Sequence, residues 1–104
     1  MMDEKDKIYV QKFMAFSVRI VQLCKYLNEK KNEYVLAKQI LRSGTSIGAN
    51  HREAIYAETD LDFMLLKATN YISKEQFDSL YTDAEEIMKM LTSSILTAKR
   101  SLNH

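Results

Sequence analysis

The residues whose types could support chemistry lie in the middle of the chain, where His51 and Glu53 stand two positions apart. A histidine and a carboxylate can transfer a proton or bind a metal ion, but a metal site needs several converging ligands. The other histidine is His104, and no spacing supplies a further ligand. Ser43 and the hydroxyl residues beside it would act as nucleophiles only if a general base faced them. We therefore predict a protein that is not an enzyme and has no catalytic residue, metal site or cofactor.

Both glycines, Gly44 and Gly48, lie one turn apart in a segment whose flanks have helical apolar spacing. A glycine inside a helix costs about 1 kcal/mol relative to alanine, so we interpret the pair as a surface for close helix packing. A break between two shorter helices is the alternative. Asn50 falls on the same seam, where a buried amide can fix register and oligomeric state, or bind a ligand. The residues predicted to serve packing and assembly are Ser43, Gly44, Ile47, Gly48 and Asn50.

The charge balance gives no bulk argument for a partner. Lysine and arginine total 15 against 14 aspartates and glutamates, and the net charge is +1. Binding to nucleic acid, a membrane surface or an acidic substrate would have to depend on how these charges are distributed. One interpretation is an ordinary solvated face, and the other is a basic surface formed in an assembly. The basic residues that could form it are Arg19, Lys25, Lys30, Lys31, Lys38, Arg42, Arg52, Lys99 and Arg100.

The composition favours an all-α fold. The 104 residues include two glycines and no proline, which suits long helices and not the many turns of a sandwich or barrel. This length fits one domain over residues 1–104 with a modest core. Oligomerisation would enlarge that core. Cys24 is the single cysteine, which excludes an intrachain disulfide and fits a reducing compartment. No signal peptide or transmembrane span is predicted, so we expect a cytoplasmic protein without a membrane partner.

The pattern predicts four helices in an up-down-up-down bundle. The first covers about residues 5–28, with an apolar seam that Val10, Val21 and Cys24 widen. The fourth begins at Ser73, which forms a capping box with Gln76. The seam of the first helix consists of Tyr9, Phe13, Phe16, Ile20, Leu23 and Leu27. The fourth helix has its seam at Phe77, Leu80, Ala84, Ile87, Leu91, Ser94, Ala98 and Leu102.

The two middle helices are predicted to differ in length. The second covers about residues 33–57 with Asn32 as its cap, and the third begins with Thr59 as cap and both following aspartates in its first turn. A third helix of about 14 residues reaches only some 21 Å, whereas its neighbours are roughly 36 Å long. We therefore expect part of the core to lie uncovered. The apolar side of the third helix consists of Leu61, Met64, Leu65 and Ala68.

A sequence signature accompanies this pattern. Residues 41–50, LRSGTSIGAN, followed by Arg52-Glu53-Ala54, resemble the signature of the 23S rRNA intervening-sequence protein family, also called four helix bundle proteins. Residues 66–73 with the helix at 83–87 resemble the last connection and fourth helix of that family. The resemblance implies a small bacterial four-helix bundle that assembles into a ring-like homopentamer. Accessory proteins of diversity-generating retroelements are similar in fold, and there a basic pentamer surface engages nucleic acid and the reverse transcriptase.

The chain departs from the family pattern at two places. His51 stands where the family usually has an aliphatic residue. Family members usually carry about twenty more residues between Phe63 and Met64, which corresponds to about six helical turns. The third helix is therefore expected to be shortened.

These observations lead to two functional hypotheses. The first is a non-enzymatic oligomer that binds RNA or DNA, or a nucleic-acid enzyme, through surface lysine and arginine. Its predicted contacts are Arg42, Arg52, Lys99 and Arg100. The alternative is a structural or adaptor protein that receives a partner helix on the small-residue face around Gly44 and Gly48.

Overall fold

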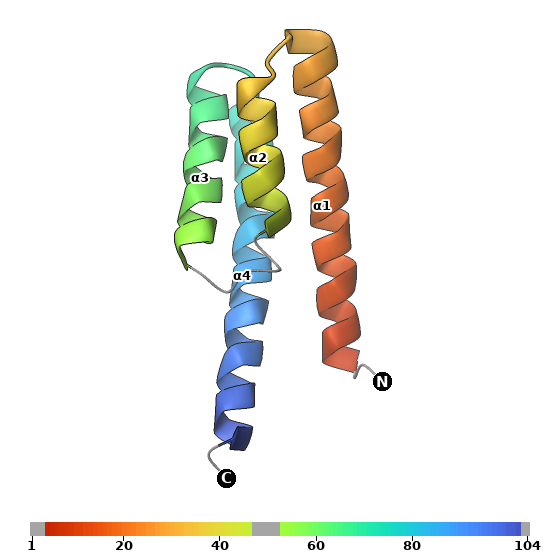
Figure 1. Cartoon of the computed structure of the whole chain (residues 1–104), viewed down its shortest axis with the longest axis vertical. Coiled ribbons are helices and arrows are strands. Elements are labelled where there is room, and N and C mark those ends of the chain that lie inside the picture. The colour runs from red at the N-terminus through yellow and green to blue at the C-terminus, as the bar shows by residue number, and fades with distance from the viewer. Residues whose placement is uncertain (1–3, 47–52, 103–104) are drawn as a thin grey trace.

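The computed structural model contains four helices, with bounds α1 Glu4–Lys31, α2 Val35–Ser46, α3 Glu53–Ala68 and α4 Lys74–Leu102. It describes residues 4–46 and 53–102, and the side chains of residues 4, 7–46 and 57–90. Each helix packs against the next one along the chain, and α1 also packs against α4. Successive helices run in opposite directions (Figure 1). The described residues include no strand, and the predicted all-α, up-down-up-down four-helix bundle is confirmed.

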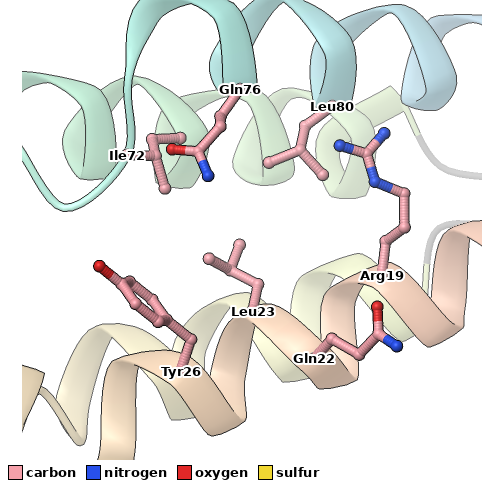
Figure 2. A pocket seen from close by; sticks show the side chains of 7 residues that line it. All are labelled: Arg19, Gln22, Leu23, Tyr26, Ile72, Gln76 and Leu80. Atoms are coloured by element: carbon pink, nitrogen blue, oxygen red, sulfur yellow. The ribbon is translucent and has the colours of Figure 1, made fainter. Parts of the chain in front are cut away.

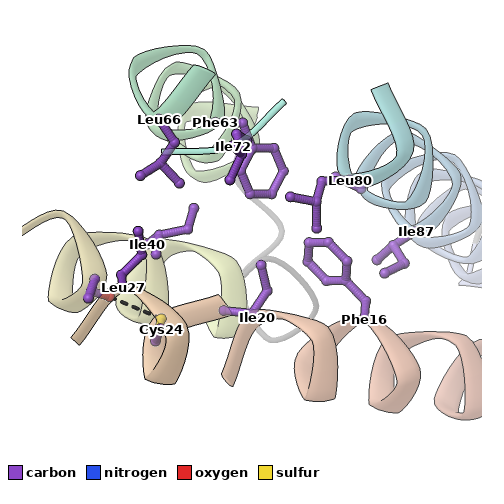
Figure 3. Close-up of a cluster of buried hydrophobic side chains, with 12 residues drawn as sticks. Phe16, Ile20, Cys24, Leu27, Ile40, Phe63, Leu66, Ile72, Leu80 and Ile87 are labelled. Atoms are coloured by element: carbon purple, nitrogen blue, oxygen red, sulfur yellow. Dashed lines mark hydrogen bonds between the residues drawn. The ribbon is translucent and has the colours of Figure 1, made fainter. Parts of the chain in front are cut away.

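The core forms along the predicted seam of α1. Phe16, Ile20 and Leu27 are buried and meet side chains of all three other helices (Figure 3). Cys24 is also buried, where its Sγ donates a hydrogen bond to the carbonyl oxygen of Ala37 at 3.1 Å. Burial raises the pKa of the Cys24 thiol to about 11. The remaining members of this buried cluster are Ala37, Ile40, Phe63, Leu66, Ile72, Leu80, Ala84 and Ile87.

The predicted widening of the α1 seam is wrong at two residues. Val10 and Val21 are exposed, whereas Cys24 lies in the core. The outward residues Met14 and Val18 are exposed as well, and they follow Val10 at four-residue steps. Alpha1 therefore has a second apolar stripe beside its buried one, because neither α2 nor α4 covers that flank.

The predicted boundary between the second and third helices is also wrong. Alpha2 ends at Ser46 and α3 begins at Glu53, so the alternative of two shorter helices is correct. A second helix over residues 33–57 would be about 37 Å long, and about 14 residues could not return the chain to the start of α4. Helices of 12 and 16 residues are nearly matched at about 18 and 24 Å. Alpha1 and α4 continue beyond both of them (Figure 1).

The predicted N-caps Asn32 and Thr59 do not cap the N-termini of α2 and α3. Asn32 has a φ of 53° directly after α1, in the left-handed conformation that asparagine tolerates. The side chain of Glu33 caps α2 instead, because its Oε1 accepts the backbone N–H groups of Val35 and Leu36 at 3.1 and 3.0 Å. These backbone bonds, that of Leu36 above all, lower the pKa of Glu33. Thr59 is fully buried within α3.

The inward side of α3 is the reverse of the predicted one. Leu61, Met64 and Leu65 point outward and are 64%, 50% and 43% exposed. The buried side carries Thr59, Asp62, Phe63 and Leu66. Both sides of this helix carry large apolar residues, so periodicity alone could not decide which one faces the core. On the buried side, Asp62 Oδ1 accepts a hydrogen bond from Gln39 Nε2, and its Oδ2 accepts one from the Ser43 hydroxyl, each at 2.7 Å.

The predicted capping box of α4 is confirmed. The backbone N–H of Gln76 donates to Ser73 Oγ at 3.1 Å, and the backbone N–H of Ser73 donates to Gln76 Oε1 at 2.8 Å. Replacing Ser73 with alanine should therefore lower the free energy of unfolding by about 1 kcal/mol. Urea denaturation followed by circular dichroism measures this change. Ser73→Asp, which retains an acceptor for the Gln76 N–H, should stay close to the parent, and equal losses in both variants would contradict the capping role.

Candidate nucleic-acid interface

The net charge of +1 conceals a separation of charge along the chain. Residues 19–42 contain six lysines or arginines and two glutamates, whereas residues 58–90 contain three lysines and eight acidic residues. The first group occupies the second half of α1 and most of α2, and the second group occupies α3 and most of α4. One pair of helices is therefore basic and the other pair is acidic, which provides the uneven distribution that anion binding requires.

Four lysines of the basic pair remain available to a ligand. Lys25, Lys30, Lys31 and Lys38 are exposed, and none of them forms an ion pair with another described residue. They lie in the last two turns of α1 and the first turn or so of α2, at the end of the bundle where the short connection 32–34 joins the two helices (Figure 1). We call these four residues the lysine cluster.

Two exposed tyrosines lie among the lysines. Tyr34 is 61% exposed, and Tyr26 is exposed with the Nζ of Lys31 5.9 Å from its ring centroid. Tyr34 also borders a shallow groove of about 420 Å³ along α2, together with Lys38 and Arg42. Exposed aromatic rings between cations are the combination that single-stranded nucleic acid uses, because bases stack on the rings while phosphates approach the cations.

Contacts within the fold hold this end of the bundle in place. Glu33, between the two helices, caps α2 and accepts a hydrogen bond from the Tyr71 hydroxyl at 3.2 Å. Tyr71 belongs to the connection between α3 and α4, so this bond joins the two connections at the same end. Glu33 is thereby engaged in structure, and the one other acidic residue between Lys25 and Lys38 is Glu29.

Of the four predicted nucleic-acid contacts, the structure describes the side chain of Arg42. Arg42 is exposed but pairs with Glu58 of α3 at 2.9 Å. Arg52 lies outside the described residues. Lys99 and Arg100 lie on the last turns of α4, where the structure describes the helix backbone and not the side chains. These turns extend beyond the end of α2 (Figure 1). Among the described residues, the lysine cluster supplies four exposed cations without an ion pair at one end of the bundle. The sequence carries a local signal for this cluster, because residues 25–38 contain four lysines and two tyrosines.

Two of the residues predicted for helix packing, Ser43 and Gly44, lie in the part of the chain that the structure describes. Gly44 faces Ile20 of α1 so closely that an added Cβ would lie 3.0 Å from the Ile20 Cγ1. Ser43 is buried against Asp62. Alpha1 and α3 of the same chain therefore occupy the Ser43 and Gly44 part of the face that the adaptor hypothesis offers to a partner. Ile47, Gly48 and Asn50 lie outside the described residues, as does His51.

Among the described residues, no three histidine, cysteine, aspartate or glutamate side chains gather in a way that could hold a metal ion. None of the described helices combines the length and apolar character needed to cross a membrane.

Comparisons with known proteins agree with this fold. A crystal structure of a protein with unknown function from the S23 ribosomal protein family of Bacteroides thetaiotaomicron matches with a TM-score of 0.77 and 39% sequence identity. The match covers 88% of this chain and 97% of that one. No curated protein matched the sequence. The family model described as 23S rRNA-intervening sequence protein matches residues 5–65, more than half of the chain. This chain therefore belongs to the 23S rRNA-intervening sequence protein family.

Proposed function

We propose that this protein is a non-enzymatic, cytoplasmic homo-oligomer that binds RNA or DNA through the lysine cluster and the two tyrosines beside it. The observation that carries the proposal is that four exposed lysines at one end of the bundle form no ion pair with any described residue. Elsewhere, Lys12, Arg19, Arg42, Lys74 and Lys89 are neutralised by acidic partners. The cluster thus retains charge that phosphates can neutralise with release of counterions.

The outward face of α3 supports self-association. Leu61, Met64 and Leu65 are exposed on one side of the helix, and Ala57 and Ala68 continue the same side. A contiguous apolar face of this kind usually marks an interface. Resemblance to the family makes a homopentamer the expected assembly. Its subunits would meet through unlike surfaces, since a ring requires heterologous contacts.

Charge placed on this face should therefore separate the subunits. Leu61→Glu combined with Leu65→Glu should lower the mass measured by light scattering to that of a monomer, while the far-ultraviolet circular dichroism remains helical. Both positions are exposed within the single chain, so their charges are buried only in the assembly. Gln11→Glu combined with Thr82→Glu adds the same charge at exposed polar positions of α1 and α4 and should leave the oligomer intact. An unchanged mass in the leucine double variant would contradict an interface at α3.

The function is tested by measuring absolute mass by light scattering, with and without a mixed-sequence RNA or DNA pool, at low and moderate salt. The expected result is an oligomer that gains nucleic acid at low salt and loses it as salt rises. An oligomer that ignores both nucleic acids at both salt concentrations would contradict nucleic-acid binding. A monomer that binds nucleic acid would contradict the assembly alone.

A further inference from the structure

A pocket opens between α1 and α4, next to the part of α1 that carries Lys25 and Lys30. Its volume is about 240 Å³, and Leu23, Leu80 and Ile72 supply apolar surface inside it (Figure 2). Ile72 and Leu80 are buried members of the core, so this part of the pocket is fixed by the packing of the bundle. The pocket is smaller than the roughly 300–1,000 Å³ of sites for drug-sized ligands. It has room for one small ring system.

The rim of the pocket carries groups suited to a flat, hydrogen-bonding ring. Tyr26 and Gln22 border it from α1, and Gln76 borders it from α4 (Figure 2). Gln22 is exposed, and its amide makes no hydrogen bond with the other described residues. Gln76 uses its Oε1 to accept the Ser73 N–H, which leaves its amide N–H groups available as donors. The two amides therefore offer donors and an acceptor, and Tyr26 offers a ring face.

The charges around the pocket favour a neutral ligand. Arg19 lies at the rim, but its Nη1 donates to Asp83 Oδ2 at 2.6 Å and to Ser79 Oγ at 3.0 Å. The carboxylate neutralises the guanidinium, so the pocket presents no net positive charge to a phosphate. The lysine cluster does present such charge. Lys25 adjoins Tyr26 in sequence, and Lys30 lies one turn further along the same helix.

We infer that this pocket holds one unstacked base of a single-stranded nucleic acid, while Lys25 and Lys30 bind the adjacent phosphates. The base would stack against Tyr26 and exchange hydrogen bonds with Gln22 and Gln76. The inference rests on the proposed function and specifies it: the ligand is a single strand, because a base within a duplex is stacked between its neighbours and cannot enter without being flipped out.

The test compares the affinities of the full-length protein for short single-stranded RNA, single-stranded DNA and duplex DNA at one salt concentration. Tyr26→Ala and Gln22→Leu should each weaken single-strand binding, with a loss of roughly fivefold to a hundredfold for Tyr26→Ala, the range that stacking of one base supplies. Duplex binding should stay unchanged. Tyr26→Phe, which retains the ring, should restore most of the single-strand affinity. A 2-aminopurine placed in the strand should lose fluorescence on binding the parent protein and not on binding Tyr26→Ala.

Gln11→Leu is the matched control, because Gln11 is an exposed glutamine of α1 outside the pocket. It should change neither affinity. Equal single-strand affinity in the parent and in Tyr26→Ala, with binding that still falls with salt, would overturn the base pocket and leave the proposed function standing. Absence of binding by the parent protein at low salt would overturn both. A preference for RNA over DNA with the same response to the variants would support the pocket and identify the ligand as RNA.

Discussion

Replacing Lys30, Lys31 and Lys38 together with glutamine is expected to lower single-strand affinity roughly a hundredfold at about 0.1 M salt, as loss of counterion release at three phosphates predicts. All three side chains are exposed and form no ion pair with a described residue. Their removal should therefore leave the fold intact while it removes charge that the ligand neutralises. A fluorescence anisotropy titration measures the affinity, and a thermal melt verifies the fold.

The matched control neutralises three other lysines. Lys7 and Lys12 lie in the first half of α1, and Lys89 lies beyond the middle of α4; Lys12 and Lys89 are paired with Glu86 and Glu85. Changing these three to glutamine alters the net charge by the same amount at positions away from the lysine cluster. We expect a much smaller loss of affinity than in the cluster variant. Equal losses in both triple variants would mean that net charge, and not the lysine cluster, governs binding.

The second large effect is expected at Asp62, the buried carboxylate between α2 and α3. Asp62→Ala should lower the free energy of unfolding by about 1–3 kcal/mol, because it leaves the buried Ser43 hydroxyl and the half-buried Gln39 Nε2 without their acceptor. Relief of the desolvated charge offsets part of this loss. Urea denaturation measures the change. Asp62→Asn retains one amide oxygen as acceptor and can donate to Ser43 Oγ, so its loss should be smaller.

Asp60 provides a contrasting control two residues earlier in α3. Its Oδ1 is buried without a hydrogen-bond partner among the described residues. Burial and the nearby charge of Glu85 raise the pKa of this carboxyl. A carboxyl with a raised pKa in the folded state destabilises the fold above that pKa and ceases to do so as the pH falls below the unfolded value. Asp60→Asn should therefore raise stability at pH 7 and lose this advantage in acid. A stabilised Asp62→Ala or a strongly destabilised Asp60→Asn would contradict these assignments.

The long helices could be predicted because their signals are local. Phe16, Ile20 and Leu27 repeat at helical spacing in α1, and Ser73 with Gln76 marks the start of α4 within four residues. The boundary between α2 and α3 could not be predicted from such local signals. Helical spacing continues from α2 towards α3, and the division depends on the length of chain needed to reach α4, which is a property of the whole bundle.

The orientation of α3 depended on contacts that are remote in sequence. Phe63 and Leu66 compete with Leu61 and Leu65 for the core, and the apolar pattern ranks neither pair first. In the fold Phe63 and Leu66 are buried, and Asp62 beside them bonds to Ser43, 19 residues away. Such a bond cannot be inferred from spacing within one helix.

The candidate site was partly accessible from the sequence. All four members of the lysine cluster lie within residues 25–38, so their proximity follows from two helices joined by a short turn. Which cations remain unpaired did not follow, because the pairs Arg42–Glu58 and Lys12–Glu86 each join residues of two different helices. The prediction therefore named Arg42, which the structure pairs with Glu58, and did not name Lys30 or Lys38.

The most direct test of nucleic-acid binding at the lysine cluster is the slope of the logarithm of the binding constant against the logarithm of salt concentration. It is measured with one single-stranded oligonucleotide for the parent protein and for the Lys30, Lys31 and Lys38 variant. The parent should give a clearly negative slope, and the variant a slope smaller in magnitude by about 2 for each chain that contacts the strand. Binding that is independent of salt, or equal slopes in the two proteins, would contradict phosphate binding at this end of the bundle.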